Sequence, residues 1–188
     1  MRIAVYCSSR ENIPQSYRDD AAIIGNYIGS HRHTLIYGGI GSGLMETVSV
    51  AAHATGARVV GIVPVTKKHL CHGVNDENIL ACNLSDRKAK MIQLGEQFIV
   101  LPGGYGTLDE MVSTFSSLTF TGDEEKHIIM LDKDGLFEPI LSQLQLMTGK
   151  GLMSGDSLSR IIVADSAHEC CKMIEDICRL QNDKNPSL

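Results

Sequence analysis

The sequence predicts an α/β fold, a doubly wound parallel sheet with helices on both faces. Three observations support this prediction. Segments typical of strands alternate with segments typical of helices along the chain. The strand segments are short and continuously apolar, as expected for parallel strands that helices cover on both faces. Glycine-rich turns at residues 38–43 and 103–106 each follow a strand segment and lead into a helix.

The expected elements follow in order along the chain. Short apolar runs predict strands at residues 3–7, 34–37, 59–63, 79–82, 98–101, 128–131 and 160–163. Apolar residues at helical spacing predict helices at residues 21–28, 44–54, 86–94, from 107 onward, 136–147 and 167–180. The least regular part is 66–85, which contains the small strand at 79–82. Polar loops are expected at 119–126 and 149–158.

Length and composition indicate one globular domain over residues 1–180, followed by a loose tail over 181–188. The net charge of −5 argues against a duplex-binding surface, so no nucleic-acid partner is expected. No apolar run approaches the roughly 20 residues that span a bilayer, so no membrane partner is expected either. Six cysteines without CxxC spacing favour reduced thiols and a cytoplasmic location.

The most informative stretch is 98–110, in which an apolar strand runs into Pro102 and three glycines follow within four positions. Thr107 and Glu110 then match a capping box, the signature of a helix N-terminus. Unpaired backbone N–H groups and the positive end of a helix dipole favour anion binding at such a turn. Two structural alternatives stay open: the glycines simply join a strand to a helix, and Glu110 only caps that helix.

The predicted strand order strengthens the case for a ligand. If the strands follow the common doubly wound order, the order reverses between the first strand and the strand at residue 98, and ligands bind beyond the carboxyl ends of the strands at that point. Three loops, residues 7–10, 38–43 and 102–107, then meet there. We therefore expect a ligand the size of a phosphate or a nucleotide. Neither glycine turn has the GxGxxG spacing of dinucleotide-binding proteins, and the chain contains no GxxxxGK[ST] phosphate loop.

Four motifs resemble one known family. Residues 102–110, PGGYGTLDE, resemble the PGGxGTxxE signature of the LONELY GUY (LOG) family of cytokinin riboside 5′-monophosphate phosphoribohydrolases. Residues 86–91, DRKAKM, resemble its ERKxxM segment. Residues 37–45, YGGIGSGLM, and 6–9, YCSS, resemble its YGGGxxGLM turn and FCGSS opening. The matches occur in the family's order over about residues 3–180.

The resemblance implies a Rossmann-like subunit in a homodimer or a larger homo-oligomer. It implies an N-glycosidase that hydrolyses nucleoside 5′-monophosphates, either cytokinin nucleotides or simpler ones such as AMP, to free base and ribose 5-phosphate without a cofactor or a metal. The catalytic pair falls on Glu110 and Arg87. The substrate-binding positions are Ser8, Ser9, Gly39, Gly41, Ser42, Met45, Lys88, Gly103, Gly104, Tyr105, Gly106 and Thr107.

The residues suit that chemistry. Departure of the base builds positive charge on the ribose, and a carboxylate beside the ring stabilises it. Arg87 either binds the phosphate or ribose, or orients the acid. Met45 and Tyr105 either face the base or pack. Ser42 either contacts the ligand or caps its helix, and Arg10 is either a second phosphate contact or a surface residue.

The chain departs from the family pattern at several positions. Glu46 stands where many members have glycine, Ser113 where members often carry a second acid, and Ser8 where glycine is common. These departures leave the preferred base open. The alternative function is a non-catalytic protein of the same fold that binds or carries a nucleotide or a molybdenum cofactor. Two further clusters are weighed and set aside: no zinc site is expected from His69, Cys71, His72 and Cys82, and the cysteines at 170, 171 and 178 are expected to pack in the core.

Overall fold

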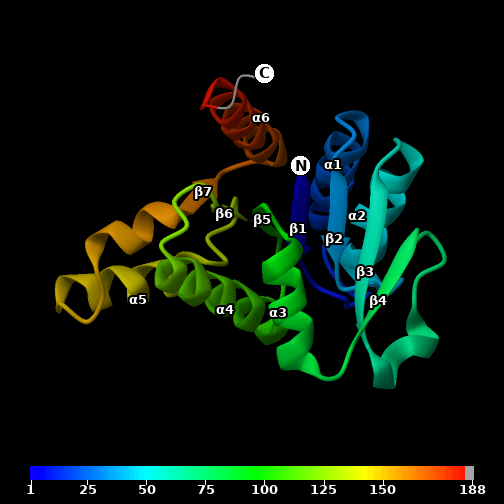
Figure 1. Cartoon of the computed structure of the whole chain (residues 1–188), viewed down its shortest axis with the longest axis horizontal. Coiled ribbons are helices and arrows are strands. Elements are labelled where there is room, and N and C mark those ends of the chain that lie inside the picture. Colours follow the sequence, from blue (N-terminus) through cyan, green and yellow to red (C-terminus); the bar gives the residue numbers. More distant parts are fainter. Residues whose placement is uncertain (185–188) are drawn as a thin grey trace.

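The computed structural model describes residues 1–184, and within them all strands form one parallel sheet (Figure 1). The order across the sheet is β4-β3-β2-β1-β5-β6-β7. The strands span Arg2–Tyr6 (β1), Thr34–Tyr37 (β2), Arg58–Pro64 (β3), Glu77–Ala81 (β4), Gln97–Val100 (β5), Ile128–Leu131 (β6) and Ile161–Ala164 (β7). The order reverses between β1 and β5, as the sequence predicts, and the doubly wound parallel fold is confirmed.

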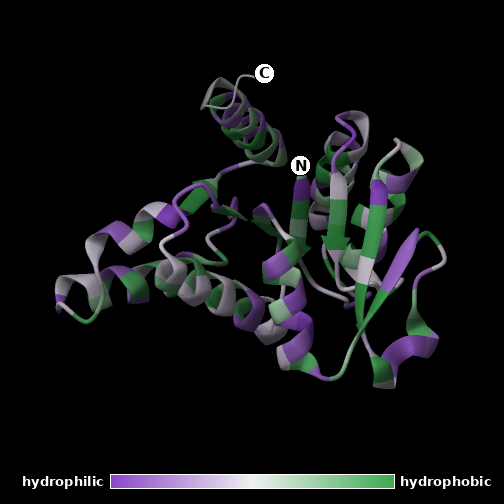
Figure 2. Ribbon diagram, in the orientation of Figure 1, coloured by the Kyte–Doolittle hydropathy of each residue, from purple (hydrophilic) through white to green (hydrophobic). Residues whose placement is uncertain are grey.

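Helices connect the strands on both faces of the sheet. The α-helices are Gln15–Ser30 (α1), Gly43–Ala54 (α2), Leu84–Leu94 (α3), Tyr105–Thr121 (α4), Glu138–Gly149 (α5) and Ala167–Lys184 (α6), and two 3₁₀ helices span Val65–Leu70 (η1) and Gly155–Arg160 (η2). Consecutive residues of a strand point to opposite faces. Val5 therefore packs in a core with α1, α2 and α6, and Tyr6 packs in a second core with α3, α4 and α5. Figure 2 shows the apolar character of the central strands and the more polar edge strand β4.

Helix α4 differs from the sequence prediction at both ends. Gly104 is the N-cap, the helix begins at Tyr105, and the cap receives no side-chain hydrogen bond. The predicted capping box is therefore wrong, because Thr107 lies inside the helix and is not its N-cap. The carboxylate of Glu110 pairs with Arg87 instead. At the other end the helix runs to Thr121, into the predicted loop. It ends at Gly122, whose φ of +68° is the left-handed conformation common after helices.

The C-terminal tail also differs from the prediction. Helix α6 continues to Lys184, whereas the sequence predicts a loose tail from residue 181. Residues 185–188 of that tail lie outside the described residues. None of the helices in the described chain combines the length and apolar character that a bilayer crossing requires.

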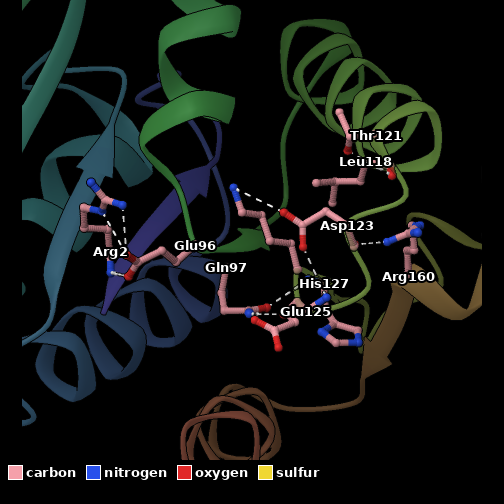
Figure 3. Close-up of polar contacts among 10 residues, drawn as sticks. Arg2, Glu96, Gln97, Leu118, Thr121, Asp123, Glu125, His127 and Arg160 are labelled. Carbon is pink, nitrogen blue, oxygen red and sulfur yellow. Dashed lines mark hydrogen bonds and ion pairs between the residues drawn. The ribbon is translucent and has the colours of Figure 1, made fainter. Parts of the chain in front are cut away.

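A polar cluster fixes the starts of β5 and β6, at the edge of the sheet where these strands begin (Figure 3). The side-chain amide of the fully buried Gln97 donates to the carbonyl of Glu125 at 2.7 Å and accepts from the N–H of His127 at 2.9 Å. Arg160 donates to the carbonyl of Asp123 in the same loop. These bonds satisfy a buried amide and hold the register of two central strands. The candidate site lies at the opposite end of the strands, where they finish.

Candidate active site

A cavity of about 380 Å³ opens at the carboxyl ends of β1 and β5, where the strand order reverses. Residues 7–10 after β1 form one wall, and residues 104–107 with Glu110 of α4 form another. Met45 of α2 and Arg87 of α3 complete the lining. Two hollows of about 560 and 650 Å³ lie elsewhere, but position at the carboxyl edge of the sheet, not size, marks the ligand site of this fold.

The cavity wall contains a buried ion pair. A terminal guanidinium nitrogen of Arg87, Nη1, lies 3.0 Å from Oε1 of Glu110, and the side chains are only 12% and 6% exposed. Arg87 Nε also donates to the carbonyl of Ile62 at the end of β3, at 3.0 Å. A Cβ on Gly38 would stand 2.3 Å from the Arg87 guanidinium, so glycine there makes room for the arginine. The structure thus brings the two predicted catalytic residues together.

The environment of Glu110 sets its charge. Burial raises the pKa of the Glu110 carboxyl, and the guanidinium of Arg87 opposes that shift. A buried ion pair contributes little net stability, because desolvation offsets most of the attraction. A charged pair held in a cavity wall at such a cost marks a candidate catalytic site.

The N-terminus of α4 faces the cavity without a side-chain cap. Gly104 and Gly106 have no positive φ, and a Cβ on either would meet no protein atom within 4 Å. Neither backbone strain nor packing within the chain explains glycine at these two positions. Both positions leave open space beside the backbone N–H groups, as a close-bound anion would require. Gly103, also a predicted binding residue, is not among the residues that line the cavity, and its Cβ would stand 2.1 Å from Oγ1 of Thr107.

The loop after β1 is tied to both neighbouring loops. The Ser8 N–H donates to the carbonyl of Pro102 at 3.1 Å, and the Leu44 N–H donates to the carbonyl of Ser8 at 2.9 Å. The hydroxyl of Ser8 accepts from the N–H of Arg10 at 3.1 Å. These bonds place Ser8, Ser9 and Arg10 in the cavity wall opposite α4.

In the glycine turn at residues 38–43, other parts of the chain contact the backbone. Gly39, Gly41 and Ser42 are not among the residues that line the cavity. The Gly39 carbonyl accepts from the His72 N–H at 2.9 Å and from the Asn75 side-chain amide at 3.1 Å. A Cβ on Gly41 would stand 2.5 Å from the His72 ring. Ser42 is the N-cap of α2 but makes no side-chain cap bond.

The first N–H groups of α2 are also taken by the chain. The Gly43 N–H donates to the Glu11 carboxylate at 3.1 Å, and Leu44 donates to Ser8 as described above. The turn packs against Arg87 and Met45 through Gly38. Because these N–H groups are already hydrogen-bonded, the start of α2 does not offer them to a ligand as the start of α4 does.

Two predicted binding residues lie at the margin of the site or beyond it. Lys88 is not among the lining residues, because its ammonium pairs with both carboxylate oxygens of Asp109 at 2.6 and 2.7 Å. Tyr105 lines the cavity but is 87% exposed, so it stands at the rim. Cys7 also lines the cavity; the sequence places it in one of the three converging loops, although it is not among the predicted binding positions.

The other cysteine and histidine clusters have structural roles. His72 shares a hydrogen bond of 3.1 Å with the hydroxyl of Ser49. Within residues 1–184, no group of three or more histidine, cysteine or acidic side chains is arranged to hold a metal ion. Cys170 and Cys171 of α6 are buried in the core, and Cys178 of the same helix packs against it.

Comparisons with known proteins show the family of this chain. A family model described as "Possible lysine decarboxylase" matches residues 45–174. Cytokinin riboside 5′-monophosphate phosphoribohydrolase LOG3 of Arabidopsis thaliana is 36% identical over 179 residues, which cover 93% of this chain and 82% of that protein. The phosphoribohydrolase LOG of Oryza sativa subsp. japonica is 35% identical over 181 residues, which cover 93% and 73%.

Solved structures share the fold at lower identity. The molybdenum cofactor binding protein of Rippkaea orientalis superposes with a TM-score of 0.73 at 23% identity, covering 94% of this chain and 96% of that one. The molybdenum cofactor carrier protein of Chlamydomonas reinhardtii gives 0.74 at 17% identity, covering 95% and 98%. At these identities the likeness concerns the fold alone. Identity above 30% to the curated relatives over nearly the whole chain shows more: the chain belongs to the LOG family.

Proposed function

We propose that this protein hydrolyses the N-glycosidic bond of nucleoside 5′-monophosphates. Water adds to C1′ of the ribose, the bond from C1′ to the base breaks, and the products are free base and ribose 5-phosphate. The relatives named as cytokinin riboside 5′-monophosphate phosphoribohydrolases support this reaction class. The observation that carries the proposal is the buried pair of Arg87 and Glu110 in a cavity that also contains an uncapped helix N-terminus.

Each wall of the cavity has a part in the proposed reaction. The N–H groups at the start of α4 bind the phosphate, with the serines after β1 and the charge of Arg10 opposite. This anchor places the ribose beside Glu110, one helical turn further along α4. As the base departs, the Glu110 carboxylate stabilises the positive charge on the ribose and orients the attacking water. Arg87 keeps Glu110 ionised and fixes its direction.

A panel of substrates tests the proposal. Cytokinin riboside 5′-monophosphate, AMP and other nucleoside monophosphates are incubated with the protein, and free base is measured by chromatography. We expect base release from monophosphates and at least about tenfold slower release from the matching nucleosides, because the phosphate supplies orientation energy. Equal rates on nucleosides would contradict the phosphate site. Tight nucleotide binding without any base release would instead favour a carrier protein.

A further inference from the structure

Helices α3 and α4 are joined by two ion pairs between neighbouring positions. Arg87 and Lys88 follow one another on α3, and their partners Glu110 and Asp109 follow one another on α4. The inner pair lines the cavity. The outer pair lies outside the lining, with Lys88 20% exposed and Asp109 55% exposed. The Lys88 ammonium contacts both Asp109 oxygens, so this contact is better defined than most surface ion pairs.

The α3 side of this arrangement is fixed locally. The side chain of Asn83 caps the helix by accepting from the Asp86 N–H at 2.9 Å, and the Asp86 carboxylate accepts from the Cys82 N–H at 2.7 Å. Arg87 is held to β3 through the Ile62 carbonyl. Lys88, the next residue, is therefore presented to α4 by a helix start with little freedom to move.

The charges around Glu110 come from three elements. Arg87 and Lys88 of α3 favour its ionised form, whereas Asp109, its neighbour on α4, opposes that form. Tyr6 and Cys7 face it from the end of β1 and its loop, and burial raises the pKa of both groups, so they remain neutral. Arg10 lines the same cavity as a cation. Asp109 is thus the negative charge that acts on Glu110, and Lys88 is the group that pairs with it.

We propose that Lys88 is a positioning residue of the site: by neutralising Asp109 and joining α4 to α3, it keeps the Glu110 carboxylate ionised and facing Arg87. This inference rests on the proposed function for its catalytic meaning. Its physical content, the effect of an outer ion pair on an inner carboxylate, does not depend on the substrate. The sequence resemblance placed Lys88 among the substrate-binding residues, and the structure assigns it this different task.

The experiment compares three variants by the titration of Glu110. Lys88→Met removes the cation, Asp109→Asn removes the anion, and the double variant removes both. Lys90→Met is the matched control, because Lys90 lies on the same helix and pairs with Asp86 away from the cavity. The Glu110 carboxyl is followed by carbon-13 NMR, with Glu110→Gln identifying its signal. The acid limb of the rate of base release is measured alongside.

The expected shifts have opposite signs. Lys88→Met raises the pKa of Glu110 by about half a unit and Asp109→Asn lowers it by a similar amount, the scale of one partly exposed charge near a buried carboxylate. In the double variant and in Lys90→Met, the pKa of Glu110 stays close to that of the wild type. If the outer pair were merely structural, both single variants would shift the pKa of Glu110 in the same direction, and that outcome overturns the proposal. So does a Lys88→Met protein with an unchanged titration but a raised KM, which would mark a substrate contact.

The NMR titration needs no substrate. If the protein releases no base from any nucleotide, the proposed function fails, while the signs of the NMR shifts still decide the role of Lys88.

Discussion

At the scale of single residues, the proposed phosphate site contains glycines that the chain does not need for its own packing. Gly104 and Gly106 stand in open space at the start of α4, whereas Gly103 and Gly38 make room for protein side chains. Sequence spacing alone predicts a glycine turn but does not distinguish these two uses. The structure separates glycines in open space, which we propose give clearance to a ligand, from glycines that give clearance to Thr107 or Arg87.

This distinction predicts an unusual effect for Gly106→Ala. Alanine favours the helix, and its Cβ meets no protein atom, so we expect the free energy of unfolding to rise by about 0.5–1 kcal/mol. Nucleotide affinity should fall at least about tenfold, because the methyl group occupies ligand space. Chemical denaturation and calorimetric titration with AMP measure the two effects. A variant with unchanged affinity would show that the phosphate does not approach this turn.

The contact between the two proposed catalytic residues was not predictable from local pattern. Arg87 and Glu110 lie on different helices, and no periodicity brings them together. The family resemblance named them, and only the packing of α3 against α4 shows their contact. The resemblance also named Gly39, Gly41 and Ser42, which do not line the cavity in this structure. Hydrogen bonds with Glu11, His72 and Asn75 hold that turn, and such bonds cannot be predicted from sequence patterns.

At the scale of elements, strands and helices were predictable because their apolar periodicity is strong, but the ends of α4 were not. The pattern Thr-x-x-Glu normally signals a capping box, and here the glutamate serves the cavity instead. The polar residues near the other end resemble a loop, yet the helix continues until Gly122. At the N-terminus an ion pair across the cavity wall replaces the expected capping bond, and at the C-terminus Gly122 decides the boundary.

The C-terminus of α4 gives a test at this scale. Gly122 has a φ of +68°, and a Cβ there would meet nothing, so Gly122→Ala carries only the cost of backbone strain. We expect a loss of about 1 kcal/mol in urea denaturation. Gly149→Ala is the control, because Gly149 ends α5 without a positive φ and has the same open surroundings. It should be neutral or slightly stabilising, and equal losses in both variants would refute the assignment.

At the scale of the whole molecule, the strand order places the site. Continuous apolar strands predicted a parallel sheet, and the reversal between β1 and β5 located the cavity before any side chain was considered. What the sequence could not supply was the contact between helices that follow different strands. Those contacts depend on the packing of two cores on opposite faces of the sheet.

The fold also contains a source of acid sensitivity near the start of β2. His33 is half-buried, its Nε2 is buried without a hydrogen-bond partner among the described residues, and burial lowers its pKa to about 4. The unfolded chain binds a proton at this residue near pH 6.5, whereas the folded chain does not. This part of the stability is therefore complete above pH 6.5 and is lost as the pH falls toward 4.

The corresponding prediction compares urea midpoints at pH 7 and pH 5. His33→Gln should lose less stability than the wild type over this interval, because glutamine cannot take up a proton. His69→Gln changes an exposed histidine on η1 and should behave like the wild type. An identical loss in the wild type and His33→Gln would show that another group controls the acid sensitivity.

The most direct test of the account is a comparison of the wild type with Glu110→Gln. The amide keeps the size and hydrogen-bonding reach of the side chain but cannot stabilise a positive charge on the ribose. Binding of ribose 5-phosphate, which has no N-glycosidic bond to break, is measured by calorimetry, and free base from a nucleoside 5′-monophosphate is measured by chromatography. The account predicts binding within about fivefold of the wild type and base release reduced by at least about a hundredfold. Base release at the wild-type rate from Glu110→Gln would contradict it.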